Sequence, residues 1–426
     1  MNPAAIEAHA KFVLLQWMII IAAAWVVGRL GKRIGQPLVV GEIVAGIALG
    51  PSALGLVWPH DWPVLFPPET QQSLQLLGKL GLILLLFQVG MEFDYGHLRS
   101  RSKTVLAVSV VGILAPFGIG LLIGPWLHRE FAPETPQSGF QFFLCIALSI
   151  SALPAMGRIL LEMKLERTVI GAMAIIAAAI DDVIGWILVA VATAMVASSF
   201  HGWALVGQIA GVLGFFLLLQ KVIGPLLRKI WQRTQARAPG RGMSPSFLAL
   251  LLIVLFGCCL VTNRLGVFAI FGAFLLGVSL HQEVSLVKAW REKFSDFVLV
   301  AMVPIFFTNV GLHTEIGSLK TLVAWVGCAL LLFAAVAGKL GGCYVAARVS
   351  GQPRRDAACI AGLMNTRALM ALVAINIGLD LKLLNRELFT MLVLMALLTT
   401  AMTGPLLHWW LPKELREEPA EPGALS

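Results

Sequence analysis

Charged residues are scarce in this sequence. Only 13% of its 426 residues are Asp, Glu, Lys or Arg, whereas 58% are hydrophobic and the mean hydropathy is +0.86. In soluble domains about a quarter of the residues are charged. The low charge therefore excludes an ordinary soluble fold and predicts an all-α polytopic membrane protein.

Several other signals are missing. The six cysteines lie in apolar segments without metal-ligand spacing, which favours small core residues over a metal centre or a disulfide framework. The net charge of +9 comes from short basic clusters between apolar runs, so membrane topology explains it and no nucleic-acid partner is expected. The N-terminus lacks a basic stretch followed by a small-residue cleavage site, and we expect the first apolar run to be retained. No cofactor is expected.

Hydropathy predicts about thirteen membrane-spanning helices. They are expected at residues 12–30, 37–57, 72–92, 104–127, 139–162, 167–195, 203–229, 246–263, 265–281, 294–312, 319–347, 355–379 and 386–411. Most Lys and Arg residues fall in alternate loops, on the side that also holds the C-terminal tail. The positive-inside rule then places the N-terminus outside and the C-terminus in the cytoplasm, and we expect a bacterial inner membrane.

Two adjacent carboxylates, Asp181 and Asp182, lie inside the apolar run from Val169 to Met195. A carboxylate at the membrane centre costs at least about 2.5 kcal/mol, and such residues usually mark ion or proton pathways. The alternative is a pair that only fastens helices together by hydrogen bonds. Neighbouring side chains on a helix point about 100° apart, so each aspartate needs its own partner.

Three segments of the sequence recur in the same order. The matching pairs are Cys145–Met156 with Cys359–Met370, Phe87–Asp94 with Thr308–Glu315, and Ala45–Ser52 with Gly272–Ser279. Each match joins a predicted span to one seven spans later, which inverts its direction across the membrane. Inverted repeats with a binding site at the midplane are typical of secondary transporters.

The repeat divides the chain into five regions. These are an N-terminal extra span, a first inverted repeat, linking spans with a basic cytoplasmic loop, a second inverted repeat and a disordered cytoplasmic tail. Their ranges are 1–34, 35–200, 201–264, 265–411 and 412–426, respectively.

Polar or helix-breaking residues interrupt two spans at matched positions. They are Ser149, Ser151 and Pro154 in the fifth span, and Asn365, Thr366 and Arg367 in the twelfth. Pro154 lacks a backbone donor and clashes with the preceding turn, so we expect a broken helix there. Broken helices at membrane depth line cavities and present half-helix dipoles to ions. A kinked helix with a small-residue packing face is the alternative.

Lys339 is a third deep charge, near the middle of the eleventh predicted span. An unpaired ammonium at that depth would either lose its proton or find a carboxylate, and the two aspartates are the obvious carboxylates. Snorkelling to the membrane surface is the alternative, which the central position disfavours.

Five long motifs occur in order along the chain. They are GQPLVVGEIVAGIALGPSALG (Gly35–Gly55), LLLFQVGMEFD (Leu84–Asp94), ALSISALPAMGRILLEMKL (Ala147–Leu165), AAAIDDVIGWILVA (Ala177–Ala190) and GLMNTRALMALVAINIG (Gly362–Gly378). Together they resemble the membrane domain of the cation:proton antiporter-2 family over essentially the whole chain. The resemblance implies a thirteen-span fold and a homodimer, with a dimerising scaffold and a mobile core that contains two crossed broken helices.

The resemblance also implies roles for the charged residues. In sodium/proton antiporters of that fold the second aspartate carries the cation and the proton, which corresponds to Asp182. The first aspartate pairs with a lysine, which corresponds to Asp181 and Lys339. We therefore expect Asp182, with Asp181, to bind the monovalent cation, and the polar residues of the broken helices to offer neutral oxygens or steady the half-helix ends. For Arg367 we expect contact with a helix C-terminus rather than with the ion.

Two departures from relatives narrow the prediction. Plant endomembrane relatives with the MNT motif commonly have Asn at the first acidic position, so the acidic Asp181 favours the electrogenic sodium/proton type. Kef-type potassium efflux relatives carry a cytoplasmic nucleotide-binding domain that this sequence does not include, and regulation by glutathione adducts is not expected.

The sequence thus predicts a secondary active antiporter, not an enzyme, that exchanges a monovalent cation for protons across a lipid membrane. Na⁺ is favoured, and K⁺, including Kef-type K⁺ efflux, is the main alternative. Two hypotheses from other classes are a non-transporting membrane sensor and an intramembrane aspartyl protease. The protease requires carboxylates on different helices and a GxGD motif, and neither aspartate has these surroundings.

Overall fold

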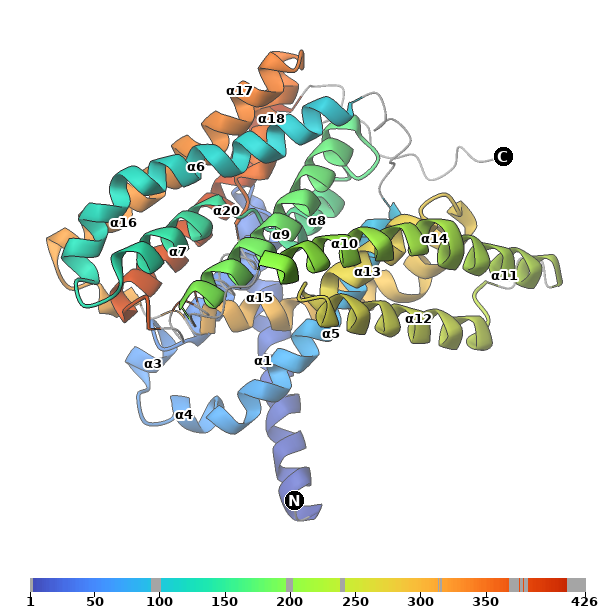
Figure 1. The fold of residues 1–426 in the computed structure, drawn as a ribbon. Coiled ribbons are helices and arrows are strands. Elements are labelled where there is room, and N and C mark those ends of the chain that lie inside the picture. Colours follow the sequence, from blue (N-terminus) through green and yellow to red (C-terminus); the bar gives the residue numbers. More distant parts are fainter. Residues whose placement is uncertain are drawn as a thin grey trace. The chain divides into compact units, whose positions relative to one another are not determined.

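The computed structural model describes residues 3–92, 101–196, 202–237, 242–312, 314, 316–367, 375, 378 and 382–411. Figure 1 shows that this part of the chain is built from helices. Within it, ten helices are long and apolar enough to cross a membrane, and Ala269–Leu280 and Val298–Asn309 are shorter apolar helices. The span predicted at 355–379 begins as helix α18 (Arg354–Met364) and then enters residues outside the described part. The total of about thirteen spans therefore stays a prediction.

The chain divides into two compact units. Unit 1 comprises Met1–Leu30, Gly41–Tyr95 and Thr193–Glu315, and unit 2 comprises Gly31–Val40, Gly96–Ala192 and Ile316–Ser426. Each unit takes segments from both predicted repeats, so the repeats, which stay a prediction, are not separate compact units. The tail predicted to be disordered, 412–426, lies outside the described residues.

Unit 1 holds the N-terminal helix and the helices of the middle of the chain. They are α1 (Pro3–Arg33), α2 (Leu38–Leu49), α3 (Leu54–Val57), α4 (Trp62–Leu65), α5 (Pro68–Glu92), α10 (Gly202–Leu218), α11 (Gly224–Arg237), α12 (Pro245–Arg264), α13 (Ala269–Leu280), α14 (Val284–Trp290) and α15 (Val303–Leu312). Short α13 follows Gly266, whose φ of 74° forms a turn that ends α12.

Glycines bring the helices of unit 1 into backbone contact. A Cβ added to Gly277 of α13 would lie 2.9 Å from the Cα of Gly90 in α5, and one added to Gly46 of α2 would lie 2.9 Å from the Cα of Gly311 in α15. Lipid tails remove the hydrophobic drive between helices, so such close packing supplies much of their attraction. All four glycines lie in the recurring segments. The contact between α5 and α13 therefore corresponds to the contact between α15 and α2.

Unit 2 holds the charged residues predicted for the site. Its helices are α6 (Ser102–Phe131), α7 (Gln137–Ser149), α8 (Leu153–Glu162), α9 (Val169–Val196), α16 (Leu322–Val336), α17 (Gly342–Val349), α18 (Arg354–Met364) and α20 (Arg386–Trp410). A π-helical turn, Ala337–Gly341, joins α16 to α17.

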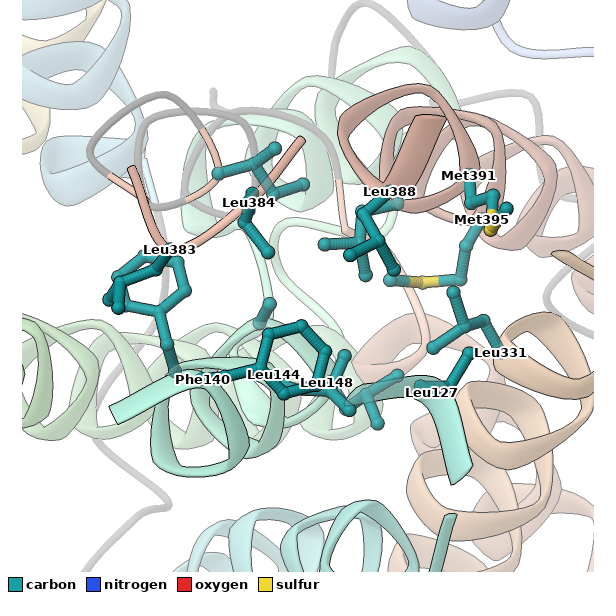
Figure 2. Close-up of a cluster of buried hydrophobic side chains, with 14 of the residues drawn as sticks. Leu127, Phe140, Leu144, Leu148, Leu331, Leu383, Leu384, Leu388, Met391 and Met395 are labelled. Atoms are coloured by element: carbon teal, nitrogen blue, oxygen red, sulfur yellow. The ribbon is translucent and has the colours of Figure 1, made fainter. Parts of the chain in front are cut away.

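A cluster of buried apolar side chains packs the helices of unit 2 together (Figure 2). Its labelled members come from α6, α7, α16, α20 and the turn before α20: Leu127, Phe140, Leu144, Leu148, Leu331, Leu383, Leu384, Leu388, Met391 and Met395. This core holds α7, the first half of the broken helix, against α16 and α20. All six cysteines of the chain are buried, as the sequence predicts for small core residues.

Candidate functional site: two interrupted helices and a carboxylate pair

The fifth predicted span is interrupted between α7 and α8. Helix α7 ends at Ser149, the backbone of Ile150 (φ −75°, ψ 132°) and Ala152 (φ −119°, ψ 96°) is extended, and α8 begins at Leu153. Pro154 occupies the first turn of α8, where its missing N–H is not needed. The break predicted from Pro154 is therefore present. It leaves carbonyls at the end of α7 and N–H groups at the start of α8 without partners in their own helices.

The place predicted for the second interruption lies against the first. Helix α18 ends at Met364, and Asn365 caps it in a helical conformation. The Ala152 N–H donates to the Thr366 carbonyl at 2.9 Å, and Ser151 Oγ donates to the Met364 carbonyl at 2.9 Å. The interruption between α7 and α8 thus meets the end of α18 at hydrogen-bonding distance in the interior of unit 2, and we call this meeting point the crossing. The continuation of the second segment, 368–374, lies outside the described residues.

Asp181, on α9, is surrounded by donors. Ser109 Oγ of α6 donates to Asp181 Oδ1 at 2.6 Å. Lys339 Nζ lies 2.5 Å from Asp181 Oδ2, and Ser151 Oγ lies 3.1 Å from the same oxygen. Both members of the Asp181–Lys339 pair have side chains that are 0% exposed. A buried charge needs both a counter-charge and hydrogen bonds, and Asp181 has both.

The π-helical turn at Ala337–Gly341 carries Lys339. Such turns are often found at functional sites. Lys339 Nζ also donates to the Ser149 carbonyl at 2.7 Å, one of the orphan acceptors at the end of α7. Close packing of Gly338 against Pro116 of α6 holds the turn in place, since a Cβ on Gly338 would lie 2.8 Å from the Pro116 Cβ. The ammonium therefore joins the carboxylate to the half-helix.

Asp182 has a different environment from its neighbour. It is 4% exposed, and the Leu153 N–H at the start of α8 donates to its carboxylate. Its Oδ1 is buried and has no hydrogen-bond partner among the described residues. A helix N-terminus attracts negative charge, so α8 favours an anionic Asp182. One carboxylate oxygen is thus left to bind a proton or a cation.

Arg367 caps the end of α7 with its guanidinium. It donates to the Leu148 carbonyl, to the Ala147 carbonyl at 3.4 Å and to the Ala335 carbonyl at 3.1 Å. Cations favour helix C-termini, where the carbonyls lack partners. The crossing therefore holds two carboxylates and two cationic side chains, and its formal charge balances.

Ser149 lies at the crossing but does not hydrogen-bond to either aspartate through its hydroxyl. Its Oγ donates to the carbonyls of Cys145, at 2.7 Å, and Ile113, at 3.1 Å. Only its carbonyl contacts the ion pair, through Lys339.

Helix α20 contributes three threonines that sequence reasoning missed. The Arg367 N–H donates to Thr400 Oγ1 at 3.2 Å, Asn365 Nδ2 donates to the Thr399 carbonyl at 3.4 Å, and the hydroxyls of Thr366 and Thr403 lie 3.1 Å apart. Ser109 was missed as well. The available signal was the TTAMT run inside an apolar span, but hydroxyls are common at helix interfaces in membranes and carry little information alone.

Most of the chain matches a known protein family. The sequence profile described as "Sodium/hydrogen exchanger, transmembrane" matches residues 19–413. The chain belongs to the sodium/hydrogen exchanger family. Membership in this transporter family, together with the ten long apolar helices of the described residues, makes it an integral membrane protein.

Two relatives in the family illustrate the match. The chain is 35% identical over 399 residues to the Na⁺/H⁺ antiporter NhaS4 of Synechocystis sp., covering 92% of this chain and 96% of that protein. It is 34% identical over 405 residues to cation/H⁺ antiporter 17 of Arabidopsis thaliana, covering 95% of this chain and 49% of the plant protein. The chain therefore spans about half the length of the plant relative.

A solved structure shares the fold. The sodium proton antiporter MjNhaP1 from Methanocaldococcus jannaschii superposes with a TM-score of 0.66, covering 96% of this chain and 99% of that one at 12% identity. At this identity the match shows the fold alone, and the fold is the sodium/proton antiporter fold that the sequence predicts.

Proposed function

We propose that this protein is a secondary active antiporter that exchanges a monovalent cation for protons at the crossing in unit 2. One observation carries the proposal: Asp182 keeps a buried oxygen without a partner beside the Asp181–Lys339 ion pair. A carboxylate in that situation can hold a proton or a cation, but not both at full occupancy. Competition for one oxygen couples the two fluxes. The names of the relatives NhaS4 and cation/H⁺ antiporter 17 agree with this function.

Each charged residue has a distinct part in the proposed cycle. Asp182 takes up a proton from one side and exchanges it for the cation on the other. Lys339 neutralises Asp181 while the cation is absent, so this pair adds no net charge when the site crosses the apolar barrier. Alternating access then exposes the crossing to each side in turn. Arg367 stays on the α7 carbonyls and does not contact the ion.

Na⁺ is the proposed cation, and K⁺ is the alternative. Both take hard oxygen ligands, and the size and rigidity of the cavity decide between such ions. The carboxylate Asp182 and the carbonyl and hydroxyl groups at the crossing are ligands of that type. Among the described residues no group of three His, Cys, Asp or Glu side chains could hold a metal ion.

Purified protein in liposomes tests the function. A pH gradient, acidic inside, is imposed, and Na⁺, K⁺ or Li⁺ is added outside while a fluorescent dye reports the internal pH. We expect Na⁺ to collapse the gradient, with K⁺ and Li⁺ compared side by side. A response that is the same with choline as with every alkali cation, at acidic and alkaline pH alike, would reject the proposal.

We further propose a homodimer in the bacterial inner membrane with the N-terminus outside. The distribution of Lys and Arg among the predicted loops supports the orientation. Membrane-impermeant labelling of single cysteines introduced at His60 and Arg348 tests it. His60 should react from the outside of intact cells and Arg348 only after permeabilisation.

A further inference from the structure

The crossing contains a second buried oxygen without a partner. Asn365 is 0% exposed, and its side-chain Oδ1 accepts no hydrogen bond from the described residues. Its Nδ2 donates to the Thr399 carbonyl at 3.4 Å, which orients the amide and leaves the oxygen for another ligand. A buried polar atom without a partner is costly and calls for an explanation.

Asn365 and Asp182 are linked through one backbone hydrogen bond, between Ala152 and Thr366. Asn365 precedes Thr366, whose carbonyl accepts from the Ala152 N–H at 2.9 Å. The next residue after Ala152 is Leu153, whose N–H donates to the Asp182 carboxylate. The hydrogen bond from Ala152 to Thr366 therefore links the residue before Leu153 to the residue after Asn365. The two oxygens without partners, Asp182 Oδ1 and Asn365 Oδ1, belong to residues on opposite sides of this bond.

The internal repeat gives the two sides matching geometry. In the alignment of Cys145–Met156 with Cys359–Met370, Leu153 corresponds to Arg367. The Leu153 N–H donates to Asp182, and the Arg367 N–H donates to Thr400 Oγ1. Thr400 thus occupies on α20 the place that Asp182 occupies on α9, with a neutral hydroxyl instead of a carboxylate.

The second pair of equivalent residues behaves in the same way. Ser151 corresponds to Asn365; Ser151 donates to Asp181, and Asn365 donates to the carbonyl of Thr399, the residue before Thr400. The Ser151 hydroxyl already donates a hydrogen bond. The Asn365 side chain donates through Nδ2 and in addition has an acceptor, Oδ1, that no described residue uses. One half of the crossing is anionic and the other offers an uncharged oxygen.

The hydroxyl groups near the crossing already have hydrogen-bond partners. Ser149 Oγ donates to two backbone carbonyls, Ser151 Oγ reaches Asp181 and the Met364 carbonyl, and Thr366 Oγ1 pairs with Thr403. Hard cations accept amide oxygens as ligands together with carboxylates. A neutral oxygen at a defined position replaces part of the hydration shell and so discriminates between ions of different size.

We propose that Asn365 Oδ1 is a second ligand of the transported cation and sets its selectivity, with the Thr399 carbonyl orienting the amide. The inference rests on the proposed antiport, because it assigns a ligand to the same cargo. It makes the cation site a pair of oxygens, one anionic from α9 and one neutral from the interruption after α18.

The experiment measures exchange and binding in four proteins: wild type, Asn365→Ala, Asn365→Asp and Asn385→Ala. For Asn365→Ala we expect the Na⁺ concentration at half-maximal exchange to rise about tenfold or more, from the loss of one buried polar contact. The Na⁺/K⁺/Li⁺ preference should change with it. Asn365→Asp has the same shape and adds a charge, so its half-maximal Na⁺ concentration should fall below that of the wild type.

The matched control, Asn385→Ala, removes an asparagine at the far end of α20. Asn385 caps that helix through the Leu388 N–H and donates to the Phe131 carbonyl. It should lower the melting temperature without changing the half-maximal Na⁺ concentration. The Na⁺-dependent rise in melting temperature of detergent-solubilised protein gives a binding readout without transport, and in Asn365→Ala it should require about tenfold more Na⁺.

The outcomes separate the ligand assignment from the proposed antiport. If Asn365→Ala does not fold, Asn365→Asp decides, since it preserves the volume of the side chain. Wild-type Na⁺ affinity and cation preference in whichever of these variants fold would overturn the role of Asn365 and leave antiport intact. A wild-type protein that exchanges no cation would instead overturn the proposed function itself.

Discussion

Lys339 and Asp181 form a fully buried ion pair, with Nζ 2.5 Å from Oδ2 and neither side chain exposed. Asp182, the next residue on α9, has no ion-pair partner among the described residues and accepts from a backbone N–H. Adjacent carboxylates therefore have separate environments, one satisfied and one left with an open oxygen. In the proposed exchange, Asp182 releases its ligand while Asp181 keeps the site together.

Replacing one partner of the Asp181–Lys339 ion pair should destabilise the protein more than replacing both partners. Lys339→Gln leaves an uncompensated buried carboxylate, which costs about 3–5 kcal/mol, whereas Lys339→Gln with Asp181→Asn leaves a neutral pair and costs less. Melting curves of the two single variants and the double variant in detergent form a double-mutant cycle. Melting temperatures that fall additively would show that the two side chains do not depend on each other.

Asp182→Asn should abolish exchange and leave the melting temperature nearly unchanged. The amide keeps the size of the side chain and can still accept from the Leu153 N–H, but it cannot carry a proton. Dye-monitored liposome exchange and melting are measured on the same preparation. Near-normal cation-driven proton flux in Asp182→Asn would contradict the role proposed for this carboxylate.

Ser109→Ala should weaken exchange through Asp181. Ser109 donates to Asp181 Oδ1 at 2.6 Å from α6, and a hydrogen bond to a charged group contributes about 1.5–3 kcal/mol. We expect exchange at limiting Na⁺ to fall by at least about tenfold, the rate equivalent of that loss. Ser149→Ala is the control, because the Ser149 hydroxyl donates to backbone carbonyls only. Equal effects of the two changes would mean that both serines only pack.

The sequence predicted the structural role of a residue where its chemistry permits only one arrangement. Pro154 cannot continue a helix interior, and the helix is interrupted just before it. A lysine in an apolar span must find a counter-charge, and Lys339 lies against Asp181. The resemblance to an antiporter family supplied the pairing, and the burial of both side chains gives its physical reason.

The sequence did not predict the role of a residue whose side chain can be satisfied in several ways. Thr399 donates to the Met395 and Ala396 carbonyls of its own helix, as a threonine does in any apolar helix. Its carbonyl receives Asn365 only because the two interruptions cross beside α20, a tertiary arrangement without a local signal. Ser109 is the same kind of case, since nothing around it in the sequence marks α6 as the neighbour of α9.

One helix extends beyond the span that hydropathy predicts. It predicts a span at 294–312, whereas helical structure begins at Val284 in α14 and passes through π-helical turns at Arg291–Ser295 and Val298–Met302. Polar residues at 291–293 end the apolar run without ending the helix. An apolar window reports the lipid-facing length, and the backbone continues wherever its hydrogen bonds can.

Two glycine substitutions in unit 1 should have opposite effects on stability. Gly277→Ala places a Cβ 2.9 Å from the Gly90 Cα and against the Phe87 carbonyl, where backbone must move, and such overpacking costs about 1–3 kcal/mol. Gly257→Ala on α12 meets nothing within 4 Å and should stabilise the helix by about 0.5–1 kcal/mol. Thermal melting of both variants checks the signs. An unchanged melting temperature for Gly277→Ala would show that α5 and α13 can separate without cost.

Transport should be electrogenic, with more protons moved than cations. A cation at Asp182 that also draws on Asp181 competes with Lys339 for its carboxylate. In the predicted exchange, Lys339 loses its counter-charge to the cation and passes on the second proton, beside the one from Asp182. Two protons for one cation move net charge, which couples the exchange to the membrane potential by about 2.3 kcal/mol per charge per 100 mV.

Currents on a solid-supported membrane measure that charge directly. A Na⁺ jump should give a transient current with the wild-type protein, and Lys339→Gln combined with Asp181→Asn should exchange without current, because the neutral pair has no proton to add. Asp182→Asn provides the baseline, since it should give neither flux nor current. The competing mechanism keeps Lys339 as a structural tie to Asp181 and the Ser149 carbonyl and exchanges ions one for one. Wild-type flux with no accompanying current would establish that mechanism and remove Lys339 from the proton pathway.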